Sequence, residues 1–182
     1  RSLSKWDGYS VTRVPYGHEV LVTPLQVIKA YAIMANGGSP VTPHLVSAIV
    51  DSNGEISKLD TPSINTGYVI DTDVANWMVR EAMVGVVTDK HGTGHEAELE
   101  KWQVFGKTGT ANISRPRGGY DTRNYVASFA GGAPAEDPAV VILVSVRKPN
   151  KSLGKGYSGG RVAAPVVKDI LENTLTYLEK IQ

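Results

Sequence analysis

Cysteine is missing from the 182-residue sequence, and so are long hydrophobic runs. The first absence excludes disulfide bonds, thiolate metal ligands and a cysteine nucleophile, but it fits either a reducing or an oxidising compartment. Apolar runs such as residues 140–144 are far below the roughly 20 residues that cross a bilayer. Residues 1–5 lack the apolar centre of a targeting signal. The first residue is not methionine, so we expect the chain to be part of a longer protein, with any membrane anchor upstream.

An excess of charge of either sign is also missing, since 19 basic residues face 18 acidic ones. The densest basic stretch, Arg115-Pro116-Arg117, is too short for a groove that follows nucleic-acid phosphates, so we expect a solvated loop and no nucleic-acid partner. The composition, with 41% hydrophobic and 20% charged residues, is typical of a soluble globular protein. A chain of this length buries roughly 70% of its unfolded surface, which predicts one domain or a large part of one.

The first half of the sequence has helical patterns. Thr23-Pro24-Leu25-Gln26 predicts a helix with a capping box, and Asn36-Gly37-Gly38 predicts its end. Residues 45–50 and 55–59 flank the turn signal Asp51–Gly54, which predicts a small peripheral hairpin. Asp71-Thr72-Asp73 predicts the start of a second helix. The faces expected to be buried are Leu25, Ile28, Tyr31, Ala32 and Ala35 in the first helix, and Val74, Trp77, Met78, Ala82 and Val86 in the second.

Strand patterns replace the helical ones from residue 102. Residues 102–111, 125–131 and 139–147 predict three antiparallel strands, and a long amphipathic helix follows Gly159-Gly160. The apolar side of this helix is formed by Val167, Ile170, Leu171, Leu175, Leu178 and Ile181. We therefore expect an α+β fold, an antiparallel sheet covered by helices. Residues 1–101 form its mainly helical region with the small hairpin, and residues 102–182 form the three sheet strands and the C-terminal helix.

Two motifs resemble a nucleotide-binding loop and a metal site, but each lacks a feature that such a site requires. Gly106-Lys107-Thr108 resembles the end of a phosphate-binding loop, but Lys101 stands where that loop needs its first glycine, and residues 112–120 predict a loop instead of a helix. His91-Gly92-Thr93-Gly94-His95 has the four-residue spacing of helical zinc ligands, but its two glycines disfavour a helix, even with Glu96 and Glu98 nearby. We expect a surface loop there, no metal and no cofactor.

The third motif is Lys107-Thr108-Gly109-Thr110, which follows the apolar residues Val104 and Phe105 in a strand. Gly109 weakens a strand, so its presence suggests that a backbone or a ligand approaches closely. Thr108 and Thr110 point to one side and offer two hydroxyls, with the charge of Lys107 beside them. Two interpretations stay open on these residues alone. One is an edge strand with a protective lysine and a glycine bulge, and the other is a strand that binds a carboxylate and stabilises an oxyanion during acyl transfer.

Lysine-threonine-glycine is one of three motifs of penicillin-binding proteins and class A β-lactamases. The similarity to class B penicillin-binding proteins, most closely their division-specific branch, covers nearly the whole chain. The segments that resemble this family are 14–18, 22–26, 30–32, 35–38, 92–94, 106–111, 125–129 with Gly131, and 159–166. The resemblance implies the C-terminal portion of a penicillin-binding-protein/β-lactamase-like transpeptidase fold.

The function implied by this resemblance is peptidoglycan D,D-transpeptidation. An active serine attacks a D-Ala-D-Ala stem peptide, and β-lactams mimic that substrate. By position, Lys107 and Thr110 are the implied catalytic residues. Lys107 supplies electrostatic stabilisation, and the backbone N–H of Thr110 is one oxyanion donor. Thr108, Gly109 and Thr110 are the implied substrate-binding residues. The implied partners are the stem peptide, β-lactams, the upstream half of the same domain and, through a membrane-anchored parent, a membrane glycosyltransferase and divisome proteins at the extracytoplasmic face.

The sequence departs from the family because the Ser-x-x-Lys and Ser-x-Asn motifs are not in their places. Ser2-Leu3-Ser4-Lys5 and Ser63-Ile64-Asn65 have these spellings, but we interpret both as coincidences of position. We therefore expect no nucleophile in this chain and no activity from the chain alone. The alternatives are a D,D-carboxypeptidase or β-lactam sensor, a non-catalytic binding module and a phosphate-binding protein.

Overall fold

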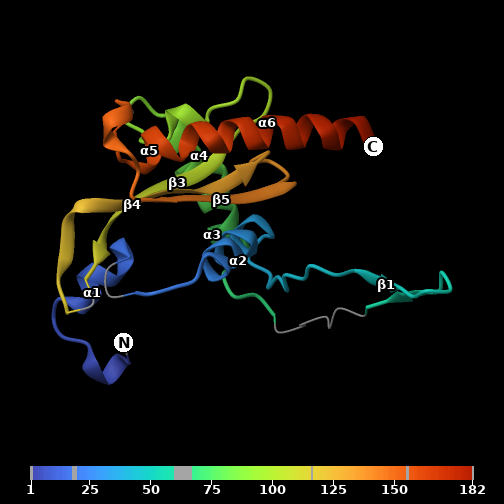
Figure 1. Ribbon diagram of the computed structural model, residues 1–182, viewed down its shortest axis with the longest axis horizontal. Helices are drawn as coiled ribbons and strands as arrows, with labels where there is room; N and C mark the ends of the chain where they lie inside the picture. The colour runs from blue at the N-terminus through green and yellow to red at the C-terminus, as the bar shows by residue number, and fades with distance from the viewer. Residues whose placement is uncertain (1, 18–19, 60–66, 116, 155, 182) are drawn as a thin grey trace.

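The computed structural model describes residues 2–17, 20–59, 67–115, 117–154 and 156–181. Its centre is an antiparallel sheet of β3 (Phe105–Ser114), β4 (Tyr120–Ala133) and β5 (Val140–Arg147), in the order β3-β4-β5. Figure 1 shows α6 (Ala164–Ile181) along one face of this sheet and α2 (Pro24–Ala35) on the opposite side. The arrangement confirms the expected α+β class, with helices on an antiparallel sheet.

Two apolar clusters hold these layers together. The first lies between the sheet and α6, and its buried members include Val87, Leu99, Val104, Phe129, Val167, Leu171 and Leu175. The second lies on the α2 side, where Tyr31, Met34 and Ala35 pack against the buried residues Val79, Met83, Val84, Phe105 and Ala135. Phe129 and Phe105 are both fully buried and belong to different clusters, as expected for residues of β4 and β3 that face opposite sides of the sheet.

The helix predicted to follow Asp71 forms, but its buried face differs from the prediction. It consists of α3 (Thr72–Trp77), a π-helical segment η3 (Met78–Ala82) and α4 (Met83–Thr88), and the Asp71 side chain caps its first turn. A π-turn contains more residues than an α-turn, so the buried positions fall about four residues apart. The buried residues are Ala75, Val79, Met83, Val84 and Val87. Of the predicted stripe, Val74 and Trp77 are largely exposed, Ala82 is exposed, and Met78 and Val86 are half-buried.

Helix α2 has the predicted start and a partly wrong face. The Thr23 hydroxyl accepts from the Gln26 N–H and the Gln26 side chain accepts from the Thr23 N–H, which confirms the capping box. The face that meets the sheet carries Tyr31, Met34 and Ala35, whereas Leu25 is 60% exposed. No residue of α2 is fully buried.

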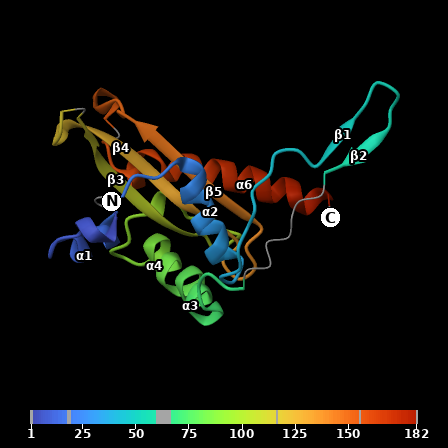
Figure 2. The ribbon, with the colours of Figure 1, turned by 90° about the horizontal axis from the view of Figure 1, so that it is seen from below.

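The small hairpin forms as predicted. It consists of β1 (Ala48–Val50) and β2 (Ile56–Lys58), with Asp51 accepting hydrogen bonds inside the turn. Figure 2 shows that it extends away from the rest of the molecule. Its apolar side chains therefore stay in solvent, and Ile49, Val50 and Ile56 are each more than half exposed.

The hairpin of β3 and β4 is longer than predicted, since residues 112–114 and 120–124 were expected to lie in a loop or outside the strand. The pairing register shifts between Asn112 and Ile113, where Asn112 pairs with Tyr125 and Ile113 pairs with Asp121. Residues 122–124 have no partner in either ladder. This bulge allows the pairing to continue to the turn that contains Arg115 and Arg117.

The C-terminal helices follow the predicted position. A short helix α5 (Gly159–Val162) leads into α6, which buries Val167, Leu171 and Leu175 and leaves Ile170 and Ile181 exposed. The remaining short helices are η1 (Leu3–Lys5), α1 (Ser10–Arg13), η2 (Val14–Tyr16), η4 (His95–Ala97) and η5 (Lys151–Leu153). No helix in the described part of the chain is long and apolar enough to cross a membrane.

Candidate functional site

Lys107 to Thr110 lie in β3, which is an edge strand of the three-stranded sheet. Thr108 pairs with Phe129, and Thr110 pairs with Ala127. Because Phe129 points into the cluster beneath α6, both threonines project to that same face. Lys107 and Gly109 project to the opposite face, towards α2. The expectation that the two threonine hydroxyls share a side is therefore met.

Each threonine hydroxyl already has one protein partner. The Oγ1 atoms of Thr108 and Thr93 are 2.6 Å apart, within hydrogen-bond distance. The Gly159 N–H donates to Thr110 Oγ1 at 3.2 Å, from the first residue of α5. Since this bond uses a lone pair of Thr110, its hydroxyl hydrogen stays available to donate to a ligand. Thr110 is exposed and Thr108 is half-buried, so the pair can be reached from solvent.

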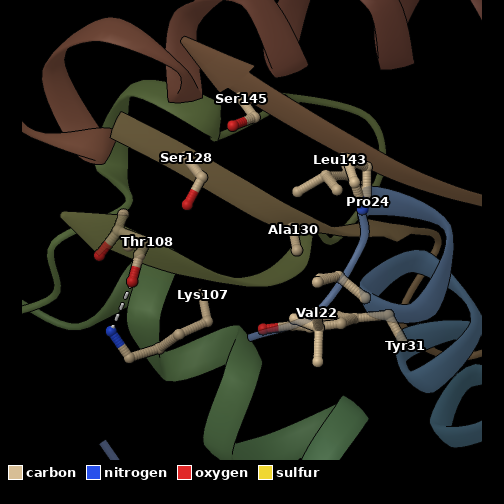
Figure 3. Close-up of a pocket in the computed structure, with 11 residues that line it drawn as sticks. Val22, Pro24, Tyr31, Lys107, Thr108, Ser128, Ala130, Leu143 and Ser145 are labelled. Carbon is tan, nitrogen blue, oxygen red and sulfur yellow. Dashed lines mark hydrogen bonds between the residues drawn. The ribbon is translucent and has the colours of Figure 1, made fainter. Parts of the chain in front are cut away.

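The Lys107 side chain curls back along its own strand. Its Nζ donates to the Thr108 carbonyl at 3.0 Å, as the dashed line in Figure 3 shows. Neighbouring side chains of a strand point to opposite faces, so a straight Lys107 side chain would lead away from Thr108. The curled side chain instead brings the ammonium back to the Thr108 carbonyl. Lys107 brings its charge to the edge of β3, next to the backbone that carries both threonine side chains.

A cavity of about 230 Å³ adjoins Lys107 on the α2 face of the sheet. Val22, Pro24, Val27 and Tyr31 form one wall, and strands β3 to β5 form the other. The strand residues in its wall are Lys107, Thr108, Gly109, Ser128, Ala130, Leu143 and Ser145 (Figure 3). Burial raises the pKa of Tyr31 above its ordinary value, so the phenol is neutral at physiological pH. Sequence reasoning assigned Tyr31 to a core and gave Ser128 no role in a cavity.

Gly159 allows α5 to lie directly on strands β3 and β4. A Cβ atom at Gly159 would be 2.1 Å from the Ser128 carbonyl oxygen and 2.6 Å from that of Gly109. A Cβ atom at Gly109 would be 2.5 Å from Ser128 Oγ. The backbone of Gly159 therefore approaches the Gly109 backbone closely from the α6 side, whereas the missing side chain of Gly109 leaves room for Ser128 Oγ on the α2 side. The Gly159-Gly160 pair was the signal for this contact, although sequence reasoning did not link it to Thr110.

The remaining candidates from the sequence are the possible metal ligands near His91 and the two serine motifs. Glu96 pairs with Arg161 at 3.0 Å, and the described residues contain no group of three or more His, Asp and Glu side chains arranged for a metal ion. Ser2 Oγ lies 3.0 Å from Ser4 Oγ beside the exposed η1 helix, and the wall of the cavity next to Lys107 contains no residue before Val22. Ser63-Ile64-Asn65 lies outside the described residues.

Comparison with known proteins identifies relatives over nearly the whole chain. A model of the penicillin binding protein transpeptidase domain matches residues 2–172. The chain is 35% identical over 163 residues to stage V sporulation protein D of Bacillus subtilis, covering 90% of this chain and 24% of that protein. It is 31% identical over 175 residues to PbpB of Mycolicibacterium smegmatis, covering 92% and 26%. The chain thus spans about a quarter of the length of these relatives.

Solved structures agree with this similarity. Penicillin-binding protein 3 of Mycobacterium tuberculosis superimposes with a TM-score of 0.84 at 29% identity, covering 98% of this chain and 40% of that one. The same protein complexed with ampicillin gives a TM-score of 0.85 at 28% identity, with the same coverage. The transpeptidase domain of Burkholderia pseudomallei penicillin-binding protein 3 gives 0.75 at 30% identity, covering 98% and 49%. The chain belongs to the penicillin-binding protein transpeptidase domain family.

Proposed function

We propose that this chain supplies one side of the active site of a peptidoglycan D,D-transpeptidase. The observation that carries the proposal is that Lys107, Thr108 and Thr110 lie together on the edge strand β3 in a member of this family. In the proposed reaction, a serine oxygen attacks the carbonyl carbon of the penultimate D-Ala in a stem peptide. An ester forms, the amide bond breaks, and the terminal D-Ala leaves as an amine that takes up the proton. The amine of a second stem peptide then attacks the ester carbonyl carbon, an amide forms, the ester bond breaks, and the serine oxygen takes up the proton that the amine loses.

The residues of β3 have distinct parts in this proposal. The Thr110 hydroxyl, whose lone pair accepts the Gly159 N–H, and the Thr108 hydroxyl hold the terminal carboxylate of the substrate. The Thr110 backbone N–H is one of two oxyanion donors. The ammonium of Lys107 stabilises negative charge near the serine of the Ser-x-Asn motif. Gly109 has no side chain to keep the substrate away from the strand.

The serine nucleophile is proposed to come from a segment outside these 182 residues. The cavity next to Lys107 lies on a sheet face that α2 covers only in part, where Ser145 is exposed and Ser128 and Leu143 are half-buried. An upstream segment that packs on this face would bring its serine to the edge of β3. By this proposal the isolated chain is inactive, because binding residues without the nucleophile retain little of the rate.

The setting of the reaction follows from the same proposal. The stem peptide is exported to the extracytoplasmic side of the membrane, so the parent protein acts there and is anchored by an upstream segment. A membrane glycosyltransferase and divisome proteins are its proposed partners. The mycobacterial relative complexed with ampicillin supports β-lactams as ligands of the proposed enzyme.

Labelled penicillin applied to the intact parent tests the proposal. We expect acylation of an upstream serine, and the variants Lys107→Ala and Thr110→Val should each slow it by on the order of 100-fold. Thr110→Ser is the matched control, because it keeps the hydroxyl and should stay near the wild-type rate. A parent that is never acylated would favour a non-catalytic binding module. Acylation of the isolated chain at Ser2 or Ser63 would contradict the proposed upstream nucleophile.

A product assay separates the related activities. With stem peptides as substrate, the proposed enzyme yields cross-linked peptides when an acceptor amine is present. Peptides that are only trimmed by one D-Ala would identify a D,D-carboxypeptidase instead, and a stable acyl-enzyme without turnover of peptides would identify a β-lactam sensor.

A further inference from the structure

Lys151 lies in the segment between β5 and α5, outside the β3 motif, and its side chain contacts strand β4. Its Nζ donates to the Arg123 carbonyl oxygen at 2.9 Å. The same ammonium lies 4.5 Å from the ring centroid of Tyr125 and 4.7 Å from that of Tyr157. The two rings stack on each other with centroids 4.3 Å apart. We call Lys151, Tyr125, Tyr157 and the Arg123 carbonyl the Lys151 cluster.

The bulge in β4 makes the Arg123 carbonyl available to this lysine. Residues 122–124 pair with neither β3 nor β5, so their backbone groups are free of the strand ladders. The Asp121 carboxylate holds the bulge by accepting from the Arg123 N–H at 2.9 Å and from Asn124 Nδ2 at 2.8 Å. With its N–H bound, Arg123 turns its carbonyl to an external donor, which Lys151 provides.

The cluster is connected to the candidate site through the backbone. Tyr157 precedes Gly159 by two residues, and the Gly159 N–H donates to Thr110 Oγ1. At the other end of the connection, the Lys148 N–H donates to the Tyr125 carbonyl at 2.8 Å. Within the described part of the connection, contacts with β4 therefore fix the segment on both sides of Lys151.

We propose that Lys151 is a positioning residue for the Thr110 hydroxyl. By fixing the connection to the bulge, it keeps Gly159 in hydrogen-bond distance of Thr110. The Gly159 N–H then occupies a lone pair of Thr110 Oγ1 and directs the hydroxyl hydrogen outwards, towards the carboxylate of the ligand. Lys151 itself touches neither the ligand nor the reacting atoms in this arrangement.

Amide hydrogen exchange on the 182-residue chain tests the positioning without any catalysis. In Lys151→Met, which keeps the length of the side chain but removes its charge and donors, we expect the Gly159 amide to exchange about tenfold faster. Lys148→Met is the matched control, because the Lys148 side chain makes no hydrogen bond, ion pair or ring contact with the described residues. Lys151→Arg keeps the charge and the donors and should restore the protection of Gly159.

The exchange of the Leu171 amide in α6 separates a local effect from a loss of folding. We expect it to be unchanged in Lys151→Met, since α6 packs on the sheet through its own buried face. Unchanged protection of Gly159 in this variant would overturn the proposal. Equal acceleration of Gly159 and Leu171 would also overturn it, because the lysine would then act on global stability only.

A double-mutant cycle on the intact parent tests the link to Thr110, and this part rests on the proposed function. Lys151→Met should slow acylation by a carboxylate-bearing β-lactam about three- to tenfold in the presence of Thr110, and have no effect in a Thr110→Val background. Additive effects of the two substitutions would overturn the link. A parent that no β-lactam acylates would refute the proposed function, while the exchange of Gly159 would still decide the role of Lys151.

Discussion

Replacing Gly159 with alanine is a direct test of how α5 packs on the candidate site. The new Cβ atom would lie 2.1 Å from the Ser128 carbonyl oxygen and 2.6 Å from the Gly109 carbonyl oxygen. Both atoms belong to the backbone of the sheet, so no side-chain rotation can relieve the overlap. The first turn of α5 has to move away by roughly 1 Å to restore ordinary van der Waals contact.

The expected free-energy change combines three contributions. Overpacking costs about 1–3 kcal/mol, and loss of the hydrogen bond from the Gly159 N–H to Thr110 costs about 0.5–1.5 kcal/mol. The reduced entropy of the unfolded chain offsets about 0.4–1 kcal/mol of this. The net destabilisation is about 2 kcal/mol, which for a chain of this size lowers Tm by about 4–8 °C.

Urea unfolding followed by circular dichroism measures this difference. Gly8→Ala is the control for the substitution itself, because nothing lies within 4 Å of a Cβ atom there, and we expect a change within about 0.5 kcal/mol. Gly85→Ala lies inside α4 with open space around it and should stabilise the chain by up to about 1 kcal/mol. If Gly159→Ala unfolds at the same denaturant concentration as Gly8→Ala, the packing of α5 on β3 and β4 is wrong.

Four further predictions concern stability and its dependence on pH. Phe129→Ala removes a fully buried ring and should cost about 3–5 kcal/mol in urea unfolding. Glu96→Gln breaks an exposed ion pair with Arg161 and should change stability by less than about 1 kcal/mol, and a larger loss would show that the pair anchors α5. Hydrogen bonds from Asn124 and the Arg123 N–H lower the pKa of Asp121. The carboxylate therefore stabilises the fold above its unfolded pKa of about 3.9, and this contribution is lost as the pH falls through the folded pKa. In Asp121→Asn, the free energy of unfolding should therefore decrease less steeply with falling pH. Burial raises the pKa of Tyr31, so its contribution is present below about pH 10 and is lost as pH rises further, and Tyr31→Phe should remove this alkaline loss.

Most of the fold could be predicted because the relevant signals are local. The capping box at Thr23 depends only on neighbouring residues, and the alternation in β3 to β5 directly reports which face each residue takes. The stripe on the helix after Asp71 could not be read from its sequence. The π-turn at Met78–Ala82 rotates the following residues relative to a continuous α-helix, so different positions face the core. Nothing in the residue types marks where a π-turn is inserted.

Only the contiguous part of the candidate site could be predicted from the sequence. The motif from Lys107 to Thr110 is contiguous, so its alternation gave the shared side of the two threonines. The partners of those threonines are Thr93 and Gly159, which belong to distant segments of the chain. Only folding brings these groups together, and a single sequence contains no distance information between them. The curled position of Lys107 likewise depends on a backbone carbonyl, which every residue has.

The consecutive order of β3, β4 and β5 has a consequence for how the chain acquires its structure. Each strand pairs with the next one in the sequence, through connections at residues 115–119 and 134–139. Closing such short loops costs little chain entropy, because the cost of closure grows with loop length. The strand pairing around Thr110 is therefore set within residues 105–147, and the Gly159 N–H that contacts its hydroxyl is added by α5. The partly covered face beside α2 is then formed by the sheet itself, and the proposed upstream segment would pack on a face that already exists.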